Sequence, residues 1–245
     1  MVNIMDYRTD LGIDKNIEYK VIKTYNNKNI KILEYINNYL YHTIKFNIAN
    51  NKLKNVIKKE LLYFFEYLNI DKNSHILVVG LGNDSITADA VGPNTIKYIT
   101  ANSHIYDLIS TNSYKVSVLE PSVLGKTGID TLSIIKSITK IIKPDLIIFI
   151  DSFVTNDINN LNKTIILTNE GIIPGSGIRN NNSDLSYKTL RSKILSIGVP
   201  TALEINNYKN SNLNLIMSTN NIDEYVSKIS EMLGNSLNEV LYKKD

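Results

Sequence analysis

Short runs of apolar residues alternate with helix-like stretches over most of the chain, and this alternation limits the possible folds more than any other feature. From residue 75 onward, strands are expected at these positions: Ile76–Val79, Val116–Leu119, Leu146–Ile150, Thr164–Leu167 and Ile194–Ile197. Apolar residues at three- and four-residue spacing predict helices over 88–101, 129–142 and 222–241. Such alternation is typical of an α/β fold with a mostly parallel sheet and helices on both faces.

The N-terminal part follows a different pattern. Residues 1–16 are polar and weakly patterned, as expected of an arm. Near-alternating apolar residues at 17–22 and 30–36 flank an Asn-rich turn and predict a β-hairpin. A helix is predicted over 50–69, where apolar residues fall on one stripe. The sequence therefore predicts a small β-rich segment ahead of the α/β core.

The composition excludes several classes of function. The 245 residues include no cysteine, which excludes disulfides, thiolate metal sites and cysteine nucleophiles. A net charge of +3 is too small to point to nucleic acid, whose binding proteins cluster positive charge. The apolar run at 146–150 is too short to span a bilayer, and the N-terminus has no signal-peptide core. We therefore expect a cytoplasmic protein with no nucleic-acid or membrane partner.

Ligands of such sheets gather where the strands end, so the residues just after each apolar run are the candidate site. Gly82 and Asn83 follow the first run, but Ser85 stands where a dinucleotide fingerprint needs its third glycine. A tight turn is the favoured interpretation, and no cofactor is expected. Glu120 and Glu204 are further carboxylates at strand ends that could ligate a metal or, by default, lie exposed in loops. A Gly-rich loop could present backbone N–H groups to an oxyanion; its residues are Gly175, Ser176 and Gly177. In a peptidase, this loop and the turn at Gly82 and Asn83 would help hold the peptide or the oxyanion.

Two aspartates, Asp89 and Asp151, each follow a different buried run, so both can face one crevice. Asp89 lies near a predicted helix start, where the helix dipole favours the ionised form. Asp151 ends an apolar strand, where desolvation favours the protonated form. Carboxylates that differ in this way can divide acid and base roles and activate a water. From the pattern alone, a role as a cap or turn residue is somewhat favoured over a catalytic role for each aspartate.

Several motifs, in their order and spacing, resemble those of the bacterial spore germination protease family. They are RTDL at 8–11, VGLGN at 79–83, TADAVGP at 87–93, EPSVLGKTGI at 120–129, KPDL at 143–146, IDS at 150–152, GIIPGSG at 171–177 and IGVPT at 197–201. The central match covers about residues 75–205, and the combination of order and spacing makes it specific.

The resemblance implies an endopeptidase that degrades small acid-soluble spore proteins during germination, in the forespore or spore core. It implies an inactive precursor that cuts its own chain between Asp10 and Leu11, a homotetramer, and an α/β fold shared with hydrogenase-maturation endopeptidases. The catalytic aspartates of the family carry over to Asp89 and Asp151. The chain then divides into a propeptide arm over 1–10, a β-rich segment over 11–48 packed on the core, and a peptidase core over 49–245.

The chain also departs from the family pattern. A C-terminal region usual in the family is expected to be missing, and Ser152 stands where Ala is usual. Three hypotheses therefore stay open. The first is an aspartate-dependent endopeptidase, and the second in rank is a shortened paralogue that binds spore proteins without cleaving them. The third is a metal-dependent maturation-type peptidase that holds a hard cation through Asp89 with Glu120 or Asp151.

Overall fold

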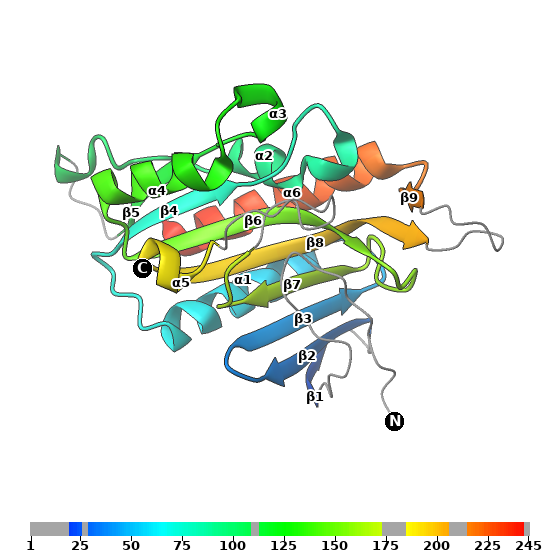
Figure 1. Cartoon of the computed structure of the whole chain (residues 1–245). Helices are drawn as coiled ribbons and strands as arrows, with labels where there is room; N and C mark the ends of the chain where they lie inside the picture. Colours follow the sequence, from blue (N-terminus) through cyan, green and yellow to red (C-terminus); the bar gives the residue numbers. More distant parts are fainter. Residues whose placement is uncertain (1–19, 26–28, 109–112, 173–184, 206–214, 243–245) are drawn as a thin grey trace.

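The computed structural model describes residues 20–25, 29–108, 113–172, 185–205 and 215–242. Over these residues the chain builds one sheet in the order β1-β2-β3-β7-β8-β6-β4-β5, with β9 paired to β8 (Figure 1). The strands are β1 (Lys20–Tyr25), β2 (Ile30–Ile36), β3 (Leu40–Phe46), β4 (His75–Gly80), β5 (Lys115–Leu119), β6 (Leu146–Thr155), β7 (Thr164–Thr168), β8 (Lys193–Ile205) and β9 (Leu215–Met217). The α-helices are α1 (Asn51–Tyr67), α2 (Val91–Ile96), α3 (Leu124–Thr127), α4 (Thr131–Ile142), α5 (Tyr187–Leu190) and α6 (Ile222–Leu241), and the 3-10 turns are η1 (Thr87–Asp89) and η2 (Tyr106–Leu108).

The sheet is mixed, so the expectation of a mostly parallel sheet is wrong. Strands β5, β4, β6 and β8 are parallel, whereas β7, β3, β2 and β1 continue the sheet in antiparallel pairs. The physical reason is that the connection between β6 and β7 is too short for β7 to run parallel to β6. Only residues 156–163 join β6 to β7, and a return to the same end of a sheet needs a dozen or more residues.

Helices cover both faces of the sheet, as the alternation predicts (Figure 1). On one face, α1, α2 and α6 pack on strand residues such as Ile148 and Ile150. On the other face, α4 and α5 pack on the alternate residues, such as Ile147 and Phe149. Because successive strand side chains point to opposite faces, the continuous apolar run of β6 fills both layers. Of the helices in the described residues, none is long and apolar enough to cross a membrane.

The strands that carry the site are longer than the apolar runs predict. The run at 146–150 continues as β6 to Thr155, and the run at 194–197 continues as β8 to Ile205. Pairing between the two strands continues through these extensions, from Asp151 with Gly198 to Thr155 with Leu203, with a register shift between Phe153 and Val154. Helix α2 is instead shorter than the predicted 88–101, since Pro93 is tolerated only in a first helical turn and the helix begins at Val91.

The N-terminal strands belong to the same sheet. β1 and β2 form the predicted hairpin, with register pairs such as Tyr25 with Ile30, and β3 joins the sheet through β7. His42 of β3 links this region to α1, because its Nδ1 lies 2.6 Å from Glu60 Oε2 and its Nε2 lies 3.2 Å from Glu34 Oε2. His42 and Glu60 are fully buried. The sheet and α1 are thus joined by a buried polar cluster as well as by apolar packing.

Candidate active site

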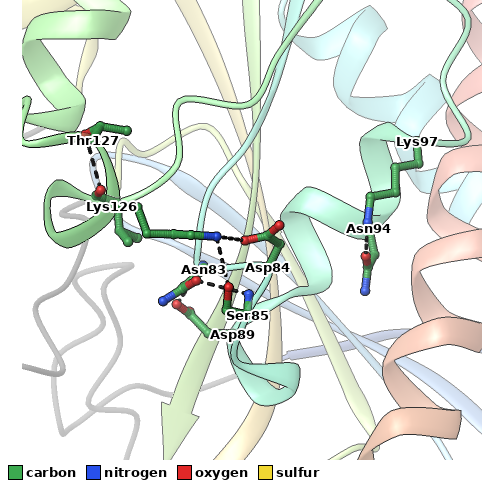
Figure 2. Close-up of polar contacts among 9 residues, drawn as sticks. Asn83, Asp84, Ser85, Asp89, Asn94, Lys97, Lys126 and Thr127 are labelled. Atoms are coloured by element: carbon green, nitrogen blue, oxygen red, sulfur yellow. Dashed lines mark hydrogen bonds and ion pairs between the residues drawn. The ribbon is translucent and has the colours of Figure 1, made fainter.

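Asp89 lies in the η1 turn, on the connection between β4 and α2. The connection folds back on itself, because the Asn83 N–H donates to the Asp89 carbonyl at 3.2 Å and to Asp89 Oδ2 at 2.8 Å (Figure 2). Gly82 makes this possible. Its φ is +113°, and a Cβ there would lie 2.1 Å from the Asp89 carbonyl oxygen, so only glycine fits. The Gly82–Asn83 turn therefore holds both the backbone and the carboxylate of Asp89.

Burial dominates the electrostatics of Asp89. Loss of water raises the pKa of this carboxyl from 3.8 to about 6, and the hydrogen bond from Asn83 opposes that rise. This rise in pKa is opposite in direction to the shift that a helix dipole at Asp89 would produce. The residue lies in a 3-10 turn ahead of a six-residue helix, so desolvation outweighs the weak dipole of so short a helix.

Asp151 lies within β6 rather than after it. Its side chain is 7% exposed, and its Oδ1 accepts a hydrogen bond from the Ser152 N–H at 2.8 Å. Strand alternation puts Asp151 on the face of Phe149 and Phe153, both in the layer under α4 and α5. Its register partner on β8 is Gly198, which adds no side chain beside the carboxylate.

The segment that carries Asp89 is bonded to β6 on both sides of Asp151. Before the turn, the Leu81 N–H donates to the Ile150 carbonyl at 2.9 Å. After the turn, the Val91 N–H donates to the Ser152 hydroxyl at 3.2 Å. The structure therefore brings Asp89 and Asp151 to the same end of the sheet, as parallel pairing of β4 with β6 requires.

The other candidate residues lie at different distances from the two aspartates or outside the described part of the chain. Glu120 follows β5 at the same end of the sheet and is exposed. Glu204 lies near the far end of β8, six residues beyond the Asp151–Gly198 pair, a separation of roughly 20 Å along the strand. Residues 175–177 and the Asp10–Leu11 bond lie outside the described residues.

A polar cluster beside the Asn83 turn carries residues that the sequence did not point to. Lys126 of α3 donates to Ser85 Oγ at 2.9 Å and forms an ion pair with Asp84 (Figure 2). The Lys126 ammonium holds the pKa of the Asp84 carboxyl below its usual range. This pairing fixes the β5–α4 connection over the turn that holds Asp89. The lysine belongs to the 120–129 motif, but no chemistry in that motif marked it.

Metal ligation has little support among the described residues. No three His, Cys, Asp or Glu side chains within them converge on a point where a metal ion could bind. The pairing of Asp89 with Glu120 or Asp151 as a cation site therefore lacks a third acidic or imidazole ligand in this part of the chain.

The chain matches one known protein family over most of its length. A family model described as germination protease matches residues 16–211. The chain belongs to the germination protease family. Both aspartates and the Gly82–Asn83 turn lie inside the matched region, whereas the Asp10–Leu11 bond precedes it.

Individual germination proteases are similar to the chain over part of its length. That of Priestia megaterium is 38% identical over 156 residues, which cover 62% of this chain and 42% of that protein. That of Oceanobacillus iheyensis is 40% identical over 153 residues, which cover 61% and 42%. The Geobacillus sp. WCH70 germination protease is 40% identical over 157 residues, with 62% and 42% covered. The similarity thus spans about two-fifths of the length of these relatives.

Proposed function

We propose that this member of the germination protease family is an endopeptidase in which Asp89 and Asp151 activate a water molecule. One observation carries the proposal: the turn that holds Asp89 is hydrogen-bonded to β6 immediately before and immediately after Asp151. Membership of a protease family supports a hydrolytic role for this pair.

In the proposed mechanism Asp89 is the general base. A carboxylate whose pKa is about 6 is mostly ionised at neutral pH and still binds a proton well, as a general base must. Asp89 takes a proton from water, and the water oxygen attacks the carbonyl carbon of the scissile peptide bond. A protonated Asp151 then donates its proton to the leaving nitrogen as the C–N bond breaks. The two roles can be exchanged, because such a pair titrates jointly.

The tetrahedral intermediate also needs hydrogen-bond donors. The Asn83 backbone N–H is already used by Asp89, so it does not serve as the oxyanion donor that the sequence suggested. The Asn83 side chain is better suited, because its Oδ1 accepts from the Ser85 N–H at 3.0 Å and this fixes the amide. We propose that the Asn83 amide N–H and the loop at 175–177 bind the substrate carbonyl.

The substrates and the maturation of the enzyme are further parts of the proposal. Small acid-soluble spore proteins are the proposed substrates, within the forespore or spore core. The arm over 1–10 is the proposed propeptide, removed by cleavage between Asp10 and Leu11, with the 11–48 segment and the 49–245 core as the mature tetramer subunit. Helices on both faces of the parallel strands support a fold of the hydrogenase-maturation endopeptidase kind.

The test is cleavage of a small acid-soluble spore protein by the purified chain, with and without residues 1–10, followed by mass spectrometry. Asp89→Asn and Asp151→Asn are expected to remain folded and to lose cleavage. The matched control is Asp107→Asn in the exposed η2 turn near the amino end of β5, and it is expected to cleave normally. Turnover by folded Asp151→Asn would contradict the mechanism. Stoichiometric binding without cleavage by every form would favour a binding paralogue.

A further inference from the structure

Two buried hydroxyl groups fasten the turn that carries Asp89 to the strands beneath it. The Thr201 hydroxyl of β8 donates to the carbonyl of Ala88, the residue before Asp89. The Ser152 hydroxyl of β6 accepts from the N–H of Val91, two residues after Asp89. Thr201 is 1% exposed and Ser152 is 6% exposed. The two bonds therefore hold the turn on either side of Asp89 in a region shielded from water.

The turn needs hydrogen-bond partners that its own residues do not supply. The first N–H groups of a helix need acceptors, which an N-cap side chain usually provides. The N-cap residue of α2 is Ala90, which has no side-chain oxygen. Ser152 provides the acceptor from a different element. Thr201 in turn fixes the Ala88 peptide, so the position of η1 depends on side chains of β6 and β8.

We propose that Thr201 and Ser152 are positioning residues, whose hydroxyls set the depth of the Asp89 carboxylate in the site and its place relative to Asp151. This inference rests on the proposed aspartate-dependent cleavage. Thr201 gives the clearer test of this role, because its hydrogen bond fixes the peptide directly attached to Asp89. Without the bond, η1 moves away from β8, water reaches the carboxylate, and the base is misplaced.

The variants separate the hydroxyl from the volume of the side chain. Thr201→Val keeps the shape and removes the donor, whereas Thr201→Ser keeps the donor. The matched control is Thr139→Val in α4, where another buried threonine hydroxyl donates to the Ile135 carbonyl at 2.7 Å, away from the site. The same change is thus made at two buried threonines, only one of which holds the Asp89 turn.

Two measurements are made on the full chain. The first is the titration of Asp89 by carboxyl NMR. In Thr201→Val the midpoint is expected to fall from about 6 toward 3.8, while Thr201→Ser and Thr139→Val keep the wild-type midpoint. The second is cleavage against pH. In Thr201→Val the kcat is expected to fall about ten- to a hundredfold with little change in KM, and the acidic limb of the pH profile moves to lower pH.

The two readouts distinguish failure of this inference from failure of the proposed function. A wild-type chain that does not cleave would refute the function, and the NMR titration would still test the positioning role. An unchanged Asp89 midpoint in folded Thr201→Val would overturn that role. So would an equal shift in Thr139→Val, because it would reveal a general response to the loss of a buried hydroxyl.

Discussion

The backbone N–H of Val91 donates a hydrogen bond to the hydroxyl of Ser152 at 3.2 Å, so helix α2 begins against the residue that follows Asp151. This contact joins the β4–α2 connection to the central strand of the parallel half of the sheet. It makes the geometry of the Asp89 turn depend on a strand that lies some sixty residues further along the chain.

Removal of the Ser152 hydroxyl is expected to destabilise the protein. In Ser152→Ala the buried Val91 N–H loses its acceptor, which costs about 1–2 kcal/mol of the free energy of unfolding. Urea denaturation measures the change. Ser137→Ala is the control, since Ser137 is exposed and its hydroxyl bonds only within α4. Equal stability of Ser152→Ala and the wild type would show that water or a shifted backbone replaces the bond.

The raised pKa of Asp89 predicts that the ionised carboxylate destabilises the folded protein at neutral pH. Because the folded pKa, about 6, lies above the ordinary 3.8, the unfolded chain loses this proton first as pH rises. The stabilising effect of the protonated group is therefore complete below pH 3.8 and is lost as pH rises through about 6. The loss is at most about 3 kcal/mol, from about 1.4 kcal/mol for each pH unit.

Asp89→Asn removes this penalty. The variant is expected to be more stable than the wild type at pH 7 by about 1–3 kcal/mol and to lose cleavage. Urea denaturation at pH 4, 5, 6 and 7 compares the two proteins. The difference in their free energies of unfolding is expected to grow with pH over this range, and parallel curves would contradict the raised pKa.

The Lys126 cluster is expected to affect mobility rather than global stability. Lys126→Met removes the bonds to Asp84 and Ser85 while it keeps a long side chain. Exposed ion pairs contribute little to folding, so the urea midpoint is expected to stay the same. Hydrogen exchange is expected to speed up in peptides that cover 82–86 and 120–129. Lys140→Met on the exposed side of α4 serves as the control. Unchanged hydrogen exchange at 82–86 and 120–129 in Lys126→Met would show that Lys126 does not restrict the motion of these segments.

The buried cluster at His42 gives a separate prediction on stability. Glu60→Leu removes the carboxylate that lies 2.6 Å from His42 Nδ1 and leaves the imidazole buried without this partner. The expected loss is about 3 kcal/mol of the free energy of unfolding. The double variant Glu60→Leu with His42→Leu is expected to recover much of it, because apolar residues of similar volume often replace a buried pair well. A double variant as unstable as the single one would count against the argument.

Local patterns were sufficient to predict much of the fold. The apolar runs at 146–150 and 194–197 lie in β6 and β8, and the helical stripe over 222–241 coincides with α6. Such periodicities reflect burial on one or both faces of a single element, and neighbouring residues encode them. The motifs also singled out Asp89 and Asp151, and their catalytic roles are still a prediction.

Only the tertiary structure decided the direction of β7, the full length of β6 and β8, and the environment of Asp89. Strand direction depends on which ends a connection can reach, and the C-terminal parts of β6 and β8 stay extended because they pair with each other. The pKa of Asp89 depends on burial by distant elements, and its position depends on hydroxyls of Ser152 and Thr201. Desolvation and long-range hydrogen bonds arise from residues far apart in sequence, so no local pattern could encode them.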